Sequence, residues 1–388
     1  PPPPSSLPLL RARGAGAVYL ALSGGNVATE RAFIMVAVMF LALLVDRRAI
    51  TLRAVAVAAV IVLTLRPEAL YGPGFQMSFA ATTELVAVFG GLRAMPGIKR
   101  RWPKWVSFIW GVALSSFVAG LATAPIAAAH FNQVPHYGLI ANILSVPLMG
   151  AIIIPGAVLA ALLAPLGQAW VGLWLMKWPI LWILSVAETV AGWDGAVSKV
   201  IAPGPLVLPV LALGALLIVI WQGRARLLGV PVMLAAFVLW TQAERPSMLI
   251  AQSGGMIGVM TDEGRALSKP TGEAFASGIW LENDGDAADQ PTAFKRARFR
   301  EDGRMRWISV GDRLVLHATG KVASASAVEA CQSVDLVVVN VAVVPAEDCT
   351  IYDANRLMKT GSLAVEAGAY GLQITTARDT GGLRLWSQ

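Results

Sequence analysis

Several polar and ionisable side chains lie inside or at the ends of strongly apolar segments, where they could bind a solute. Arg31 opens one such segment, Glu84 lies deep in another, and His130 and His136 lie on a turn between two more. A charged group at the centre of a membrane helix costs about 3 kcal/mol or more, so such groups commonly mark a solute path. The residues expected to line this path are Arg31, Gln76, Ser78, Glu84, Thr123, His130, Asn132, His136 and Asn142.

Each of these side chains also has a structural interpretation. Arg31 could extend to the membrane surface or pair with Glu30 or Glu84, and the amides and hydroxyls could join helices by hydrogen bonds. A turn at a membrane surface is polar in any case, and Asn142 could cap an opened helix. We assign no catalytic residue and expect no enzyme.

The stretch 121–156 must position most of these groups. It is apolar but carries Pro125, Pro135, Pro147 and Pro155. Proline removes helix hydrogen bonds, and at lipid depth the freed backbone groups must be covered by protein or by a water-filled cavity. We therefore expect broken helices beside a cavity or path.

The composition indicates a polytopic membrane protein. Of 388 residues, 56% are hydrophobic and 14% are charged, and the mean hydropathy is +0.63. Soluble domains contain about 25% charged residues. A spanning helix needs about 20 mostly apolar residues. The candidate spans are 32–45, 52–65, 75–92, 105–129, 139–164, 169–191, 206–221 and 227–240, of which the first two and the last are short.

Basic residues gather in the loops between these segments, and the net charge is +7. If every candidate segment crosses the membrane, the basic loops share one side, which the positive-inside rule assigns to the cytoplasm. The tail after Trp240 then lies outside. This topological role is the main interpretation, but one loop could also attract an anionic substrate as it emerges. That cytoplasmic basic loop contains Arg93, Lys99, Arg100, Arg101 and Lys104.

Two further patterns could contact nucleic acid, although each has a simpler explanation. Trp170, Trp174, Trp178 and Trp182 recur every four residues and would form a ridge on one helix. Single-stranded nucleic acid stacks on such rings, but packing against lipid or core is the commoner role. The basic run 295–306 could contact phosphates, but acidic residues interrupt it, which favours a solvated face.

From residue 244 onward, short alternating apolar runs are separated by glycine-rich and acidic turns. This pattern predicts an extramembrane α/β domain over 244–388, which follows a linker-like start over 1–13 and a transmembrane domain over 14–243. The expected strands are 248–251, 256–260, 278–281, 314–318, 334–344 and 372–376, and the expected helices are 291–300, 322–332 and 353–360.

Both cysteines, Cys331 and Cys349, lie in this tail and flank one expected strand. Outside the cytoplasm they could persist as a disulfide, because extracytoplasmic compartments are oxidising. Two unpaired buried thiols are the alternative.

Three groups of local sequences resemble, in order, the signatures of the ComEC family of bacterial competence proteins. The first is GGNVATERAFIM at 24–35; the second is RPEAL at 66–70 followed by PGFQMSFAA at 73–81; the third is TAP at 123–125 with GLIANILSVPL at 138–148. The resemblance covers about residues 15–240. The family usually begins with an OB-like module, which has no counterpart here, so we expect an N-terminally truncated member.

The resemblance implies a multi-pass protein of the bacterial inner membrane that passes single-stranded DNA from periplasm to cytoplasm. The implied partners are single-stranded DNA, membrane lipid and other competence proteins on both faces, and a homo-oligomer is compatible with this role. In this interpretation an outer entrance lies at 130–138, and a wetted path follows 75–84 and 121–156.

Many members of the family end in a metallo-β-lactamase-like domain, and the tail resembles a degenerate form of it. Residues 249–256 occupy the place of a strand and a glycine turn. Binuclear hydrolases of that fold need several histidines and an aspartate, whereas this tail has one histidine, His317. We therefore expect a periplasmic domain with no metal, no other cofactor and no nuclease activity.

Two other functions are compatible with the residues themselves. A small-molecule or lipid permease would use broken spans and polar groups at mid-membrane in the same way. A membrane-anchored, metal-dependent nuclease is disfavoured because the tail lacks the ligands.

Overall fold

The computed structural model describes residues 14, 16–44, 50–94, 103–297, 299–344, 349–368 and 370–382. The chain divides into two compact units. The first comprises Pro1–Ser198 and Pro205–Val238, and the second comprises Lys199–Gly204 and Leu239–Gln388. The second unit therefore includes a short segment that precedes the last two apolar helices.

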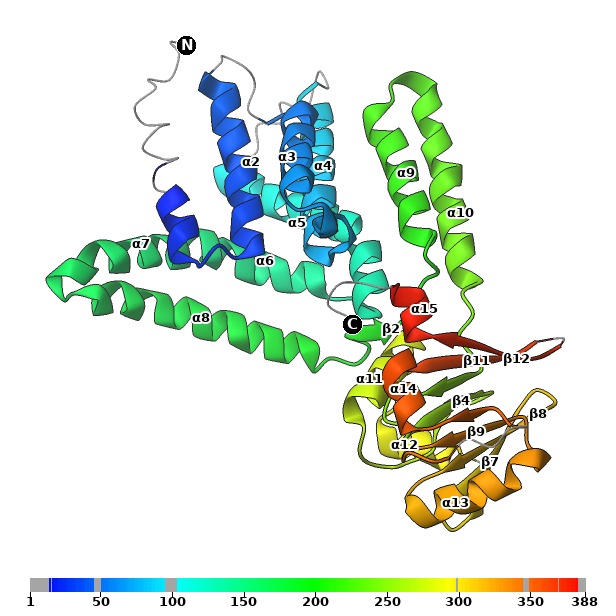
Figure 1. Cartoon of the computed structure of the whole chain (residues 1–388). Coiled ribbons are helices and arrows are strands. Elements are labelled where there is room, and N and C mark those ends of the chain that lie inside the picture. The colour runs from blue at the N-terminus through cyan, green and yellow to red at the C-terminus, as the bar shows by residue number, and fades with distance from the viewer. Residues whose placement is uncertain are drawn as a thin grey trace. The chain divides into compact units, whose positions relative to one another are not determined.

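The first unit is built from apolar helices (Figure 1). Six segments of the described part are long and apolar enough to cross a membrane, which fits a multi-pass membrane protein. They are Val27–Leu44, Pro73–Arg93, Lys104–Phe131, Gly138–Leu166, Ala169–Ala191 and Gly223–Thr241. The helices are α2 (Val27–Leu44), α3 (Leu52–Leu65), α4 (Pro73–Ala94), α5 (Lys104–Phe131), α6 (Gly138–Leu148), α7 (Ile154–Leu163), α8 (Ala169–Ala191), α9 (Val207–Ile220) and α10 (Gly229–Thr241).

The expectation that the first and last spans are short was wrong, because both helical segments begin earlier than the apolar runs do. The Asn26 side chain accepts a hydrogen bond from the Ala28 amide (2.9 Å), so the polar turn before Ala32 joins α2. A 3-10 turn, Gly223–Leu228, similarly extends α10. The shorter apolar helices are α3 and α9.

The proline-rich stretch is interrupted at the turn that contains Pro135, between α5 and α6, but its helices continue past Pro125 and Pro147. Pro125 lies within the continuous helix α5, and α6 passes into α7 through a π-helical turn, Met149–Ile153. The Trp182 indole of α8 donates to the Leu144 carbonyl (3.3 Å), one turn before Pro147. A neighbouring side chain thus supplies a hydrogen bond to the backbone of α6 shortly before the π-helical turn, where lipid-depth backbone groups need partners.

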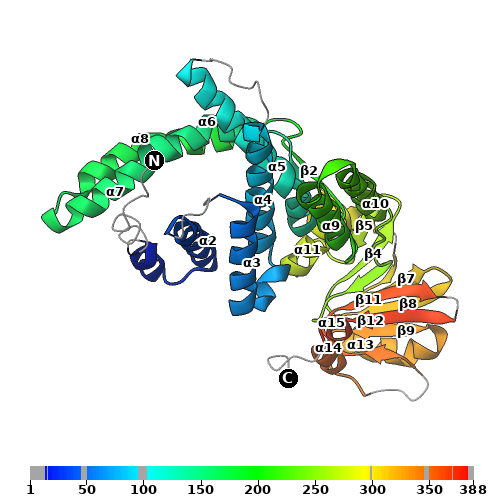
Figure 2. The same ribbon diagram turned by 90° about the horizontal axis from the view of Figure 1, so that it is seen from above.

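Two helical hairpins complete the first unit, α7 with α8 and α9 with α10, and each pair lies side by side in both views (Figures 1 and 2). Glycines allow the close approach. A Cβ at Gly172 would lie 2.5 Å from the Gly156 carbonyl oxygen, and one at Gly229 would lie 2.4 Å from the Gly214 carbonyl oxygen. Small residues at helix crossings are the usual means of close packing in membranes.

The second unit contains two five-stranded sheets. The first sheet is antiparallel in the order β12-β11-β3-β4-β5, and the second has the order β10-β9-β8-β7-β6, with β8, β9 and β10 parallel. The strands are β3 (Met248–Ile250), β4 (Ile257–Thr261), β5 (Gly264–Leu267), β6 (Arg300–Asp302), β7 (Met305–Val310), β8 (Arg313–Ala318), β9 (Leu336–Val339), β10 (Ile351–Tyr352), β11 (Leu363–Gly368) and β12 (Gly371–Thr376).

The two sheets pack face to face between helices, which gives four layers. Ile250 of the first sheet and Ile308 of the second belong to one buried core. Trp280 of α11 (Ala274–Asn283) packs on the outer face of the first sheet, together with α12 (Gln290–Lys295). Ala327 of α13 (Lys321–Glu329) covers the second sheet. The predicted α/β class of the tail is confirmed, and α14 (Ala354–Thr360) and α15 (Ala377–Gly381) complete the unit.

Some expected elements of the tail were wrong. Residues 278–281 lie in α11 rather than in a strand, because a short apolar run fits either element. The helix expected at 291–300 ends at Lys295, and the strand expected at 334–344 is confined to Leu336–Val339.

Cys331 and Cys349 form a disulfide in the structure, with their Cα atoms 5.9 Å apart. That separation lies within the usual disulfide range. The two cysteines are 18 residues apart in the sequence. In the chain-entropy model, closing a loop of that length stabilises the fold by about 3 kcal/mol.

Candidate functional site

The Arg-Ala-Phe and Pro-Gly-Phe signatures meet where α2 contacts the first turn of α4. A Cβ built on Gly74 would lie 2.7 Å from both terminal guanidinium nitrogens of Arg31 and 3.0 Å from its Cζ. Glycine at 74 therefore leaves the space that the guanidinium occupies. The apolar residues of the same signatures also pack together, since Ile34 contacts the core that contains Phe75 and Phe79.

Arg31 has no carboxylate partner among the described residues. The pairing with Glu30 that we considered does not form, because Glu30 binds Arg66 instead (3.0 Å). The Arg31 Nε is buried and makes no hydrogen bond. The site therefore holds a guanidinium that keeps hydrogen-bonding capacity for an anion.

Gln76 connects α4 to the end of α5. Its amide nitrogen donates to the Leu70 carbonyl (2.9 Å), and its oxygen lies 2.8 Å from the His130 Nε2. With the amide in this orientation, His130 must carry its proton on Nε2 and donate it to Gln76. Two of the predicted path residues are thus brought together by a direct contact.

These residues form one group, here called the signature cluster: Glu30, Arg31, Arg66, Gly74, Gln76 and His130. A cavity of about 10 Å³ adjoins it and is lined by Val27, Glu30, Arg31, Ile34, Val62, Leu65, Arg66 and Ala69. A space of that size accommodates about one water molecule. The cavity at the cluster is therefore not an open path for a polymer.

The remaining residues of the histidine turn contact other partners. Asn132 ends α5 in the left-handed conformation (φ 53°) and is buried. The His136 Nε2 lies 2.7 Å from the Ser198 hydroxyl, and the Tyr137 ring packs edge-on against Trp193. A two-stranded sheet, β1 (Gln133–Pro135) with β2 (Val197–Lys199), lies beside these contacts. The two histidines expected at one entrance thus have different partners: His130 contacts Gln76 of α4, and His136 contacts Ser198 of β2.

Among the described residues, no hydrogen bond or ion pair joins the signature cluster to Ser78, Glu84, Thr123 or Asn142. Thr123 bonds to the Ala119 carbonyl of its own helix (2.8 Å), and the Ser78 carbonyl accepts from Thr82. Asn142 is exposed on α6 and does not cap it. Glu84 is half-buried in α4, and neither Glu84 nor Asn142 has a hydrogen-bond or ion-pair partner among the residues that the structure describes.

The basic loop lies partly outside the described residues, because Lys99, Arg100 and Arg101 fall within 95–102. Its two described members, Arg93 and Lys104, are exposed at the facing ends of α4 and α5. They leave two cations accessible to solvent at that end of the helix pair.

Three of the five described cations of the basic run 295–306 contact acidic or aromatic side chains within the second unit. Arg296 binds Asp286, Arg306 binds Glu301 (2.8 Å), and Arg300 lies over the Trp307 ring. These pairs favour the solvated-face interpretation over a phosphate-binding one.

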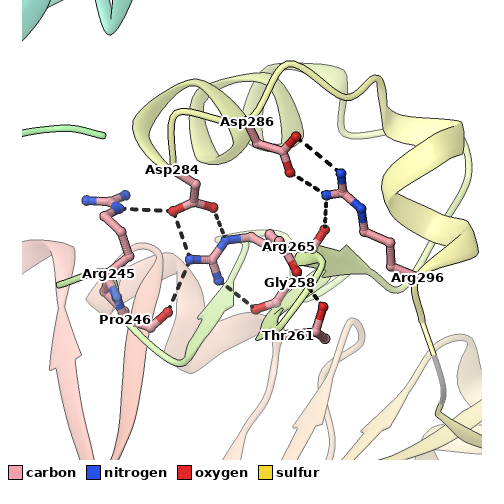
Figure 3. Close-up of polar contacts among 9 residues, drawn as sticks. Arg245, Pro246, Gly258, Thr261, Arg265, Asp284, Asp286 and Arg296 are labelled. Carbon is pink, nitrogen blue, oxygen red and sulfur yellow. Dashed lines mark hydrogen bonds and ion pairs between the residues drawn. The ribbon is translucent and has the colours of Figure 1, made fainter. Parts of the chain in front are cut away.

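A buried ion network that the sequence did not predict joins the segment before β3 to the first sheet of the second unit (Figure 3). Arg265 of β5 is fully buried and binds the Asp284 carboxylate through Nε and Nη2, the latter at 3.1 Å. It also donates to the Gly258 and Pro246 carbonyls (3.2 and 3.1 Å), while Arg245 donates to Asp284 (3.0 Å). No local pattern distinguishes this arginine from a surface one.

His317 of β8 is fully buried and holds the glycine turn that follows β3. Its Nε2 donates to the Gly254 carbonyl (3.0 Å), whereas its Nδ1 is buried without a partner. Gly254 has φ 66°, and a Cβ there would lie 2.7 Å from the Val339 carbonyl oxygen. No group of three His, Cys, Asp or Glu side chains that could hold a metal occurs in the part of the chain that the structure describes.

Burial lowers the pKa of His317 to about 4, from an ordinary value of 6.5. The folded chain therefore resists protonation that the unfolded chain accepts, so stability is unaffected above pH 6.5 and falls as the pH drops toward 4. We expect the second unit to lose about 2 kcal/mol between pH 7 and 5 from this group alone. Urea unfolding of the full chain in detergent, monitored by the proteolysis of that unit, measures this loss of stability at each pH. His317→Gln should remove that pH dependence, and an equal pH dependence in both proteins would contradict the assignment.

The sequence matches the family described as "Competence protein" over residues 2–225. ComE operon protein 3 of Bacillus subtilis (strain 168) is 26% identical over 196 residues, which are 49% of this chain and 24% of that protein. The matched region thus spans about a quarter of the relative's length. No solved structure matches the chain.

Proposed function

Because the chain belongs to the competence protein family, we propose that it is an inner-membrane channel component through which single-stranded DNA enters the cytoplasm. The family match confirms the resemblance inferred from the three signatures and supports a role in DNA uptake. That the DNA is single-stranded and that it moves from the periplasm to the cytoplasm belong to the proposal. So do the partners of the chain, which are single-stranded DNA and other competence proteins.

The observation that supports this function best is that residues from different helices meet, three of which (Arg31, Gly74 and Gln76) belong to the family signatures. Arg31 is distant in sequence from Gly74, and Gln76 from His130, yet each of these two pairs is in contact at the first turn of α4. A guanidinium with free donors suits a phosphodiester, which it can bind through two parallel hydrogen bonds. Since the adjoining cavity is only water-sized, passage of a strand requires the helices at this end to separate or further protein to complete the path.

The proposed topology places the basic loop in the cytoplasm and the second unit in the periplasm. Arg93 and Lys104 would then attract phosphates as the strand emerges. The Cys331–Cys349 disulfide supports an oxidising compartment for the second unit, because such bonds are rare in the cytoplasm.

We propose that the second unit is a degenerate metallo-β-lactamase-like domain without nuclease activity. Its four-layer arrangement of two sheets between helices supports the fold. Its single histidine is buried and bonded to a backbone carbonyl, which is a structural role rather than that of an accessible metal ligand.

The test is DNA uptake in a transformable strain from which this chain has been removed. We expect labelled duplex DNA to remain bound at the cell surface, while the protected strand in the cytoplasm falls at least a hundredfold. Restoring the chain should restore uptake. Normal uptake without the chain would reject the proposal, and a selective change in entry of small solutes or in lipid transfer would favour the permease alternative.

A further inference from the structure

The ridge of tryptophans on α8 points away from its hairpin partner. Gly172, Pro179 and Val186 form the buried face of α8, and Gly172 contacts the backbone of α7. At 100° per residue, Trp170 and Trp174 lie on the opposite side of the helix, and Trp178 lies on its flank, about 100° from the buried face. Their exposed fractions are 62%, 60% and 61%. The first unit therefore leaves these rings uncovered over about two helical turns.

A lysine lies among these rings near the middle of the span. The Lys177 ammonium is 5.4 Å from the centroid of the Trp178 ring, so the charge belongs to the same face. Lys177 is exposed and makes no ion pair among the described residues. A cation facing hydrocarbon near the centre of a spanning helix is strongly disfavoured, so this face requires water or an anionic partner.

The tryptophans of α8 also differ in position from the aromatic belt found at membrane interfaces. Tryptophans that anchor a helix gather at its two ends, near the headgroups. Here the rings follow the helix axis from its first turn to its middle, about 6 Å apart per four-residue step. Trp182, the next in the series, turns aside to bind the Leu144 carbonyl.

We infer that Trp170, Trp174, Lys177 and Trp178 form a contact surface for single-stranded nucleic acid, in which bases stack on the indoles and Lys177 neutralises a phosphate. This inference rests on the proposed function and assigns part of its path. The charge of Lys177 decides between the possible occupants of this face. A second copy of the chain would bring two lysines together, and lipid hydrocarbon would offer the lysine no counter-charge. Aromatic rings combined with a cation are the composition of sequence-tolerant surfaces for single strands.

The full-length protein in nanodiscs can be titrated with fluorescent oligothymidylate while anisotropy is recorded at several salt concentrations. Trp174→Leu and Trp178→Leu should each weaken binding at least about fivefold, because base stacking is lost while the helix stays apolar. Trp→Phe at the same positions should retain most of the affinity. Lys177→Gln should reduce the slope of log affinity against log salt by about 0.7, and Lys177→Arg should preserve it.

Two controls separate this inference from its rivals. Trp105→Leu removes an exposed ring from α5 and should leave binding unchanged. Unaltered affinity and salt slope in all the ridge variants would overturn the inference. A change from dimer to monomer with intact DNA binding would also overturn it, in favour of a second copy of the chain. If removal of the chain abolishes uptake but the ridge variants transform normally, only this inference fails; if removal has no effect, the proposed function itself fails.

Discussion

Replacement of Asp284 by alanine is expected to destabilise the second unit by about 3–5 kcal/mol. The Arg265 side chain is fully buried and Asp284 is 3% exposed, so the substitution leaves the Arg265 guanidinium in the interior without its carboxylate partner and beside the like charge of Arg245. The two carbonyls that Arg265 also binds cannot replace the lost carboxylate. Urea unfolding of the full chain, monitored by proteolysis of the second unit, measures the loss.

The matched control removes an aspartate from an exposed pair of the same unit. Arg313 and Asp335 lie 3.0 Å apart but are 41% and 32% exposed. Asp335→Ala should therefore cost about 1 kcal/mol or less. If both substitutions have the same small effect, the Arg265 network does not stabilise this unit as described.

Gly74→Ala is expected to reduce transformation at least tenfold while leaving the protein folded in the membrane. The added Cβ would collide with the guanidinium of Arg31 at 2.7 Å. That group is the end of a flexible side chain, so it can move aside, and alanine favours a helix over glycine by about 1 kcal/mol. The substitution thus displaces the cation without removing it. Transformation frequency, compared with the amount of protein in the membrane, is the measurement.

Gly91→Ala in the same helix provides the control, because a Cβ there meets no atom within 4 Å. It should transform normally. Normal transformation by Gly74→Ala as well would show that the position of Arg31 does not matter for uptake.

The sequence predicted best the elements whose apolar runs have clear ends. The α8 bounds agree with the predicted 169–191, since a glycine stands just beyond each end of that run, and 52–65 agrees with α3. It failed where a short apolar run fits a helix and a strand equally, as at 278–281. It also failed where a cap extends a helix beyond its apolar part, as Asn26 does for α2.

The contacts within the site were less predictable than its residues. Polarity in an apolar segment was enough to nominate Arg31, Gln76 and His130, but not to show which of them would meet. Their contacts depend on the crossing of α2, α4 and α5, which no local spacing determines. Arg265 was missed for a related reason, since its partner Asp284 becomes its neighbour only after β5 and α11 have packed.

The central claim is that the transforming strand passes the signature cluster. Its most direct test is photo-crosslinking during DNA uptake, with a photoreactive amino acid at position 69, beside Arg31 and Arg66 in the small cavity. A control at position 57 lies on an exposed face of α3. The account predicts that incoming labelled single strands crosslink at 69 and not at 57. Efficient transformation with no crosslink at 69, or with equal crosslinking at both positions, would contradict it.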